Sequence, residues 1–221
     1  WEKKSDALLL SWLAGQEGGN SVVDILSGKV SPSGKLPMTF PRSLTNIPSS
    51  ANFPMEGEPG SGKEGERKNW DYTNYEEDIY VGYRYYDTFK KEVSFPFGFG
   101  LSYTSFTYSF PTIKQENNQY IISVDIQNTG EYAGKEVVQL YVTAPKNESY
   151  TKPLKELKDF IKTKKIEPGE TTTVTFTLNT EDLASYDESQ HAWVVDEGLY
   201  QFLIGSSSKD IHNTLKIEVA S

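Results

Sequence analysis

Residues 173–178 read TVTFTL, so that Val174, Phe176 and Leu178 alternate with threonines. Successive side chains of a strand point to opposite faces, and antiparallel strands commonly bury one face and expose the other. The alternation therefore predicts a strand with its apolar face in a core and its threonine face in water.

The same period of two continues from about residue 104 to the end of the chain, with further runs at 122–126, 138–142 and 215–219. Turn signals separate the runs, among them Pro168 followed by Gly169, the order that a type II turn favours. Roughly seven or eight short strands in such a segment are typical of an immunoglobulin-like or fibronectin type III-like β-sandwich. The chain has no cysteine, so the paired cysteines of true immunoglobulin domains are missing.

The amino-acid composition excludes several classes of function. The chain has 221 residues, 36% of them apolar, and a formal charge of −9, which disfavours nucleic acid and anionic lipid as partners. No apolar run approaches the roughly 20 residues that span a bilayer. The absence of cysteine excludes disulfides, thiolate catalysis and cysteine-ligated metal sites.

The first 28 residues have a different pattern. The apolar run at 6–13 predicts a strand covered on both faces, and the glycine-rich turn at 15–20 breaks it. A helix is then expected over 20–27, with Gly28 at the position after its end. One strand cannot form a sheet, so we expect its partners to lie in a longer protein of which this chain is a piece.

The middle of the chain predicts a connection rather than a domain. Residues 29–50 are proline-rich and irregular, and the glycine-rich stretch at 52–69 is expected to be a mobile loop. The expected organisation is a strand–helix end of an α/β sandwich domain at 1–45, an irregular connector at 46–103 and the β-sandwich at 104–221. The fold class is thus mainly β.

Several long motifs occur in order over nearly the whole chain: WLAGQEGGN (12–20), DILSG (24–28), PSGKLPMTFP (32–41), YVGYRYYD (80–87), FPFGFGLSYT (95–104), NTG (128–130), GKEVVQLYV (134–142), PLKEL (153–157) and PGE (168–170). Together they resemble the C-terminal part of a glycoside hydrolase family 3 enzyme of the β-glucosidase and β-xylosidase type.

The resemblance implies a parent protein with a (β/α)8-type barrel, an α/β sandwich domain and a C-terminal fibronectin type III-like domain. Members of the family hydrolyse β-linked glycosides with retention, using an Asp from the barrel and usually a Glu from the middle domain. Neither catalytic motif matches a position here, so no catalytic residue is assigned and the chain alone is expected to be inactive. The implied partners are a β-linked glycoside or oligosaccharide and the missing barrel and α/β domains. The implied location is secreted or periplasmic, and no cofactor or metal is implied.

Glu17, within the turn at 15–20, is the candidate substrate-proximal residue of the parent. The turn joins a predicted strand to a helix N-terminus, where α/β folds place ligands, so Glu17 could reach a sugar hydroxyl. Alternatively, the glycines only permit a tight turn and Glu17 interacts with the helix dipole. A phosphate-binding loop is less well supported, because no Lys-Ser/Thr follows.

Other clusters have both a functional and a structural interpretation. The tyrosines could form a sugar-stacking platform, but packing of an irregular segment, with Arg84 paired to an acid, is favoured; they are Tyr72, Tyr75, Tyr80, Tyr83, Tyr85 and Tyr86. His191 and His212 are expected to be solvated loop residues rather than zinc ligands. A basic run is expected to be a solvated strand edge; it consists of Lys155, Lys158, Lys162, Lys164 and Lys165.

The main hypothesis is that this segment is a scaffold for catalytic domains outside the chain. The alternative is a non-catalytic carbohydrate-binding or adhesion module. Binding by the sandwich is expected to be weak or absent, because its aromatic residues mostly occupy core positions, with Trp193 as the exception to check. Asn147 begins a glycosylation sequon, which by itself is weak evidence.

Overall fold

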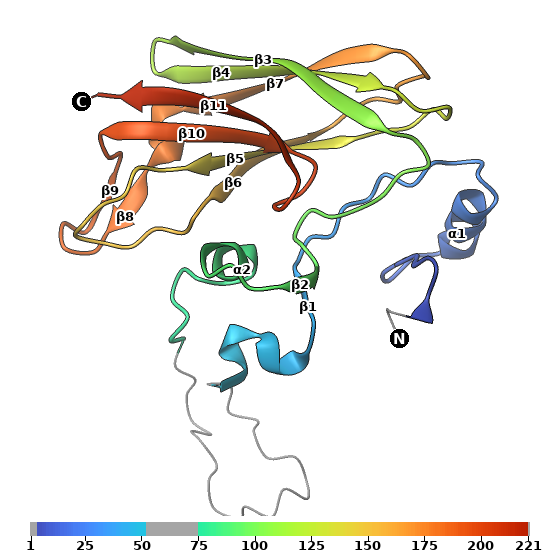
Figure 1. Cartoon of the computed structure of the whole chain (residues 1–221), viewed down its shortest axis with the longest axis horizontal. Helices are drawn as coiled ribbons and strands as arrows, with labels where there is room; N and C mark the ends of the chain where they lie inside the picture. The colour runs from blue at the N-terminus through green and yellow to red at the C-terminus, as the bar shows by residue number, and fades with distance from the viewer. Residues whose placement is uncertain (1–3, 52–74, 221) are drawn as a thin grey trace, which may run out of the picture.

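The computed structural model describes residues 4–51 and 75–220. Its main body is the predicted β-sandwich, made of two antiparallel sheets (Figure 1). The three-stranded sheet has the order β3-β4-β7, with β3 (Phe106–Glu116), β4 (Gln119–Asn128) and β7 (Thr171–Asn179). The four-stranded sheet has the order β11-β10-β5-β6, with β11 (Ile211–Val219), β10 (Gly198–Gly205), β5 (Val137–Thr143) and β6 (Glu156–Lys162). The predicted fibronectin type III-like fold is confirmed.

Alternating residues from the inner faces of the two sheets form the core. Val174 lies opposite Val124 in the register of β7 and β4, and Phe176 lies opposite Ile122. All four side chains are buried, while the intervening threonines of β7 are not. The period-two pattern therefore placed these strands and their buried face correctly.

The turn between β6 and β7 also agrees with its sequence. Gly169 has φ +80°, a conformation that glycine adopts without a side-chain penalty, and the amide of Glu170 donates to the carbonyl of Glu167 at 3.0 Å. The 3-10 helix η4 (Thr180–Leu183) follows β7. A separate hairpin then precedes β10 and consists of the paired strands β8 (Ser185–Asp187) and β9 (Ala192–Val194).

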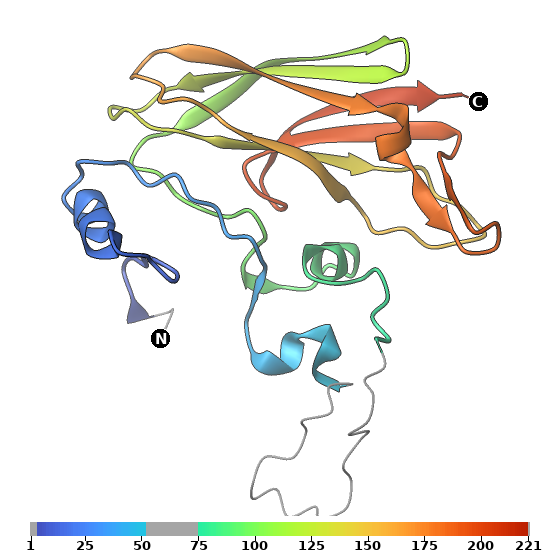
Figure 2. The same ribbon diagram turned by 180° about the vertical axis from the view of Figure 1, so that it is seen from behind.

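We call residues 29–51 and 75–103 the arm. The arm contains the 3-10 helices η2 (Leu44–Asn46) and η3 (Pro48–Ala51), the helix α2 (Tyr83–Thr88) and a small sheet of β1 (Phe40–Pro41) and β2 (Val93–Phe95). Seen from behind, α2 lies on the side of the four-stranded sheet that faces away from the core (Figure 2). The loop expected at 52–69 and Tyr72 lie outside the described residues.

The N-terminal helix α1 (Gly18–Leu26) starts two residues before its predicted start, and Gly28 follows it with φ +76°, as expected for the residue after a helix. The strand predicted at 6–13 is wrong. These residues have no regular structure, and Leu13 is fully exposed. A strand needs neighbouring backbone groups for its hydrogen bonds, and no other described strand lies beside it.

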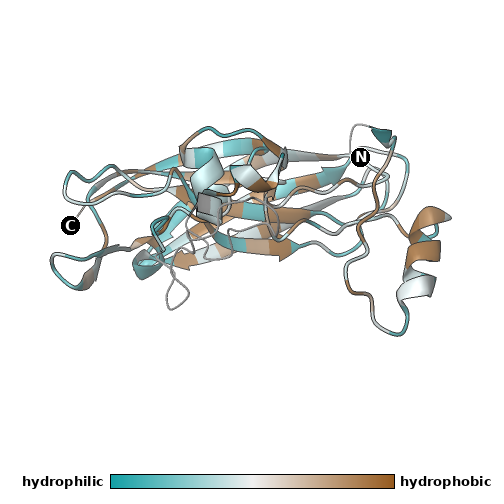
Figure 3. Ribbon diagram, turned by 90° about the horizontal axis from the view of Figure 1, so that it is seen from below, coloured by the Kyte–Doolittle hydropathy of each residue, from teal (hydrophilic) through white to brown (hydrophobic). Residues whose placement is uncertain are grey.

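Helix α1 stands clear of the sandwich and carries apolar residues on its exposed surface (Figure 3). Among these exposed residues are Val23 and Leu26. Neither α1 nor any other helix in the described ranges is long and apolar enough to cross a membrane.

Candidate functional site: the seam between arm and sandwich

The arm covers the outer face of β5, and we call this contact the seam. Val138, Leu140 and Val142 of β5 point into the core, so Gln139 and Tyr141 point to the opposite face. Both are nevertheless buried. β5 is therefore covered on two sides, by the second sheet and by the arm.

Gln139 ties three segments together at the seam. Its side-chain amide donates to the carbonyl oxygens of Gly98 (3.1 Å) and Ser206 (2.6 Å), and its Oε1 accepts a hydrogen bond from the Tyr141 hydroxyl (2.6 Å). Gly98 has φ +79°, and a Cβ atom there would overlap the Gln139 side chain. The backbone can approach this closely because residue 98 is glycine.

A buried charge cluster holds α2 on the sandwich. Asp87 of α2 lies 3.0 Å from Lys155 Nζ and 3.1 Å from Lys209 Nζ. Asp87 and Lys155 are both buried, whereas Lys209 is partly exposed. The expectation that Lys155 belongs to a solvated edge is wrong, because the arm covers this end of β6. β6 itself is an edge strand, as predicted.

The tyrosines of the arm pack as expected. The Tyr83 ring lies 4.8 Å from that of Phe97 and 5.8 Å from that of Tyr141, and its hydroxyl accepts a hydrogen bond from the Leu157 amide at 2.7 Å. Burial raises the pKa of Tyr83. Arg84 pairs with Glu156 at 2.9 Å, as predicted. Tyr75 is the exception and is exposed.

A second ion pair lies where the PSGKLP and FGFGLSY motifs meet. Lys35 Nζ is 2.9 Å from Glu136 Oε1, with both side chains largely buried, and it also donates to the Gly100 carbonyl at 3.2 Å. Two backbone hydrogen bonds of 2.8 Å join Leu36 to residues 98 and 99. Motifs about sixty residues apart in the chain therefore form one structural unit.

Asn128 organises the end of the sandwich next to the arm. Its Oδ1 accepts from the Thr104 hydroxyl (2.5 Å) and the Gly130 amide (3.1 Å), and its Nδ2 donates to the carbonyls of Tyr132 (2.8 Å) and Ile166 (2.9 Å). The side chain is completely buried, and every hydrogen-bonding position on its amide is paired. The NTG motif therefore has a structural role, since it holds together the end of the sandwich that lies next to the arm.

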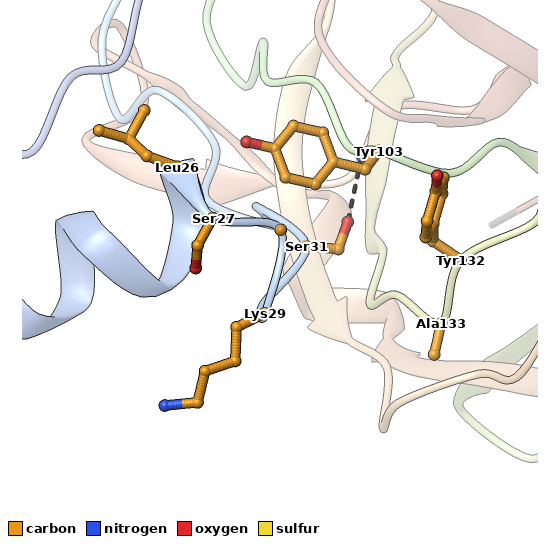
Figure 4. Close-up of a pocket in the computed structure, with 8 residues that line it drawn as sticks. Leu26, Ser27, Lys29, Ser31, Tyr103, Tyr132 and Ala133 are labelled. Atoms are coloured by element: carbon orange, nitrogen blue, oxygen red, sulfur yellow. Dashed lines mark hydrogen bonds between the residues drawn. The ribbon is translucent and has the colours of Figure 1, made fainter.

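An open pocket separates the end of α1 from the sandwich (Figure 4). Tyr103 spans it: the hydroxyl donates to the Ile25 carbonyl at 3.0 Å, and the backbone amide donates to Ser31 Oγ at 3.1 Å. Tyr132 faces the pocket from the sandwich and is exposed. Tyr103 therefore links the last turn of α1 to the arm.

Glu17 is the residue just before α1. It is exposed, and its Oε2 accepts a hydrogen bond from the Asn20 side chain at 2.6 Å. The Glu17 side chain makes no capping hydrogen bond to the backbone of α1, so this contact joins two side chains only.

The two histidines lie on different elements. His191 lies in the exposed turn of the β8–β9 hairpin with φ +51°, as a loop residue. The loop prediction is wrong for His212, which lies in β11 and stacks on Tyr108 at 4.1 Å. Within residues 4–51 and 75–220, no three acidic or histidine side chains are grouped as a metal site.

Sequence reasoning missed Asp87, Gln139 and Lys35 as seam residues. One usable signal was available for Gln139. The run VVQLYV in β5 is apolar at nearly every position, which is typical of a strand covered on both faces.

Two family descriptions match the chain. Residues 1–103 match the glycosyl hydrolase family 3 C-terminal domain, and residues 136–208 match a fibronectin type III-like domain. The chain is 41% identical to β-glucosidase BoGH3A of Bacteroides ovatus, over 99% of this chain and 28% of that protein. It is 44% identical to thermostable β-glucosidase B of Acetivibrio thermocellus, over 96% of this chain and 26% of that protein.

A solved structure shows the same similarity to β-glucosidases. β-Glucosidase 3B from Thermotoga neapolitana in complex with α-D-glucose superposes with a TM-score of 0.86 at 44% identity, covering 96% of this chain and 28% of that one. The chain thus spans about a quarter of the length of the curated relatives it matches, and it aligns with their C-terminal part.

Proposed function

We propose, since this chain belongs to glycoside hydrolase family 3, that it acts as the C-terminal scaffold of a retaining β-glycosidase. In this proposal the nucleophile and the acid/base lie outside the chain. Retention needs two carboxyl groups roughly 5 Å apart that flank the scissile bond. The family's catalytic motifs match no position here, and the chain contributes support rather than chemistry.

The seam is the observation that carries this proposal. Two largely buried ion pairs, Lys35–Glu136 and Asp87–Lys155, fix the arm to the sandwich. The sandwich closes its own core, so its outer face on β5 is free to hold the arm. The arm in turn leads to α1 through Tyr103. A continuous series of contacts therefore runs from the sandwich through the arm to α1.

The exposed apolar surface at the N-terminal end supports the same role. Leu13 is fully exposed, and Trp12 and Leu26 are also largely exposed. Soluble proteins usually cover contiguous apolar surface, so this region suits contact with further domains of the parent. We propose that residues 1–45 complete an α/β sandwich domain there and that residues 104–221 form a β-sandwich that supports this domain. Residues 46–103 connect the two.

Glu17 remains the proposed substrate-proximal residue of the parent, because the turn before α1 would lie at the end of the completed sheet. The substrate class proposed is a β-linked glycoside, supported by relatives named β-glucosidases. A relative from Bifidobacterium breve, 38% identical, is named an exo-α-(1→6)-L-arabinopyranosidase. We therefore place the choice of sugar in the domains outside this chain. Secretion or a periplasmic location is proposed from the family.

Assays of the purified chain and of the full-length protein on aryl β-glycosides test the proposal. We expect turnover by the full-length protein and none by the chain. Deleting residues 104–221 from the full-length protein should lower its melting temperature and yield, while any folded enzyme that survives keeps its sugar preference. Turnover by the chain alone, or a switch of specificity at unchanged stability, would contradict the scaffold role.

A further inference from the structure

The β8–β9 hairpin presents an aromatic pair away from the core. Tyr186 and Trp193 lie directly opposite each other in the register of the two strands, with ring centroids 5.5 Å apart and planes at 67°. The two strands belong to neither sheet of the sandwich (Figure 1). The pair therefore sits on a small projecting element.

The stabilising role of the pair does not account for its exposure. An edge-to-face contact across a hairpin contributes to its stability. Yet 72% of Trp193 and 45% of Tyr186 remain accessible to water. Exposed apolar surface of this kind commonly marks a binding site when it is held in one place. The indole retains a large surface for a ligand.

The hairpin is held rigidly from its opposite face. Asp187 is buried and accepts hydrogen bonds from the amide and hydroxyl of Ser189 (2.8 and 2.6 Å) and from the amide and side chain of Gln190 (3.3 and 2.7 Å). These bonds, led by the Ser189 hydroxyl, lower the pKa of Asp187. The carboxylate fixes the turn, so the aromatic pair needs little ordering when it binds.

The base of the hairpin is braced by a second carboxylate. Asp196 accepts hydrogen bonds from the side chains of Asn147 (2.6 Å) and Tyr150 (2.5 Å), and it pairs with Lys152. The loop between β5 and β6 is thereby joined to the segment that follows β9. Trp193 thus projects from an anchored end of the sandwich.

The charges near the pair select the kind of ligand. Glu188 and Glu197 are exposed and lie within five residues of Trp193, and no ion pair among the described residues neutralises either of them. Asp187 and Asp196 also lie within six residues, but the first is buried and the second is paired with Lys152. An acidic surface repels phosphate groups and sulfated chains. A neutral sugar has no such penalty, and the C–H face of a pyranose ring can pack on an indole while its hydroxyls meet neighbouring polar groups.

We propose that Trp193, supported by Tyr186, is a stacking site for a pyranose ring of a neutral polysaccharide. His191 lies two residues before Trp193 and is exposed, so it can offer a ring nitrogen to a sugar hydroxyl beside the indole. The site would hold the protein close to a polymer. This activity goes beyond the scaffold role.

Affinity electrophoresis of the full 221-residue chain in gels containing soluble barley β-glucan tests the proposal, with heparin as an anionic probe. We expect retardation by the β-glucan and none by heparin. Trp193→Ala should weaken the retardation about tenfold. Trp193→Phe keeps an aromatic ring opposite Tyr186 and should retain part of the binding. Phe160→Ala is the matched control, because Phe160 of β6 is also exposed (61%) but lies on another element.

The melting temperature of each variant separates loss of binding from loss of folding. Equal retardation of the wild-type chain and a folded Trp193→Ala variant would overturn the proposal, as would absence of any retardation by the β-glucan. Self-association that Trp193→Ala abolishes, without glucan binding, would also overturn it in favour of a second copy of the chain. No arm of the test depends on glycoside hydrolysis, so its failure leaves the scaffold proposal standing.

Discussion

Asp87 in α2 and Lys155, the residue just before β6, form an ion pair of 3.0 Å in which only 3% and 8% of the two side chains are exposed. The pair joins the arm to the sandwich between residues 68 positions apart in the chain. Two opposite charges removed from water depend on each other, because either one alone would be buried without compensation.

Replacing Lys155 with Met should therefore lower the free energy of unfolding by about 3 kcal/mol, since it leaves Asp87 with only the partly exposed Lys209. The double variant Asp87→Asn/Lys155→Met should recover much of that loss. Urea unfolding of the four proteins in this cycle measures the coupling. Lys165→Met is the control, because the Lys165–Glu167 pair is exposed and should contribute little to stability. Equal effects of the two lysine substitutions would contradict the role of the buried pair.

Gly98→Ala should destabilise the seam by roughly 1–3 kcal/mol, because the new Cβ both strains the backbone at φ +79° and overlaps Gln139. Gly169→Ala provides a matched comparison. Gly169 has nearly the same φ, +80°, but open space around it, so its substitution carries the backbone cost alone. Thermal unfolding should show the larger loss for Gly98→Ala. If the two losses were equal, close packing against Gln139 would have no role.

Asp196 should make the free energy of unfolding fall more steeply in acid. Burial alone would raise its pKa, but hydrogen bonds from Lys152, Tyr150 and Asn147 hold that pKa below its usual value. The unfolded chain then binds a proton at a higher pH than the folded chain does. The stabilising contribution of Asp196 is therefore complete above pH of about 4 and is lost as pH falls through the lower, folded pKa.

Asp196→Asn should accordingly reduce the free energy of unfolding at neutral pH and flatten its fall below pH of about 4. Denaturant unfolding at a series of pH values measures this. Glu116→Gln, at the exposed end of β3, is the control and should leave the curve close to that of the wild-type chain. An unchanged acid slope in Asp196→Asn would show that other carboxylates carry it.

Tyr103→Phe removes one hydrogen bond, from the Tyr103 hydroxyl to the Ile25 carbonyl, and keeps the ring. We expect a loss of about 1 kcal/mol that acts on α1 and spares the sandwich. Hydrogen exchange should show faster exchange of α1 amides and unchanged exchange in β4 and β7. Tyr132→Phe, across the same pocket, is the control, because among the described residues no hydrogen bond joins the Tyr132 hydroxyl to α1. Unchanged exchange in α1 would mean that Tyr103 does not hold the helix.

The sandwich could be predicted from sequence because its signal is local. Alternation in 173–178 reports directly which residues face the core, and Pro168-Gly169 marks its turn. The strand predicted at 6–13 failed for the opposite reason. Its apolar pattern specifies burial on two faces, and the described chain supplies no neighbouring strand to provide it.

The seam was harder to predict because its partners are distant in the chain. Lys155 looks like any other lysine of its basic run until α2 brings Asp87 to it. His212 was likewise expected in a loop, although it lies in β11, where its ring stacks on Tyr108. Local composition says how polar a residue is, whereas contacts between remote segments decide whether that residue is buried.

The seam has a consequence for biosynthesis. Several of its contacts come from the stretch just before the last strand: the Ser206 carbonyl accepts from Gln139, the Ser208 amide donates to the Phe97 carbonyl, and Lys209 pairs with Asp87. A ribosome makes the arm before it makes residues 206–209. The arm therefore leaves the exit tunnel without this part of its docking surface, and it can settle fully only after residues 206–209 have been made. A chain that stops before residue 206 would leave the arm without these contacts and exposed to the proteases that remove unfinished proteins.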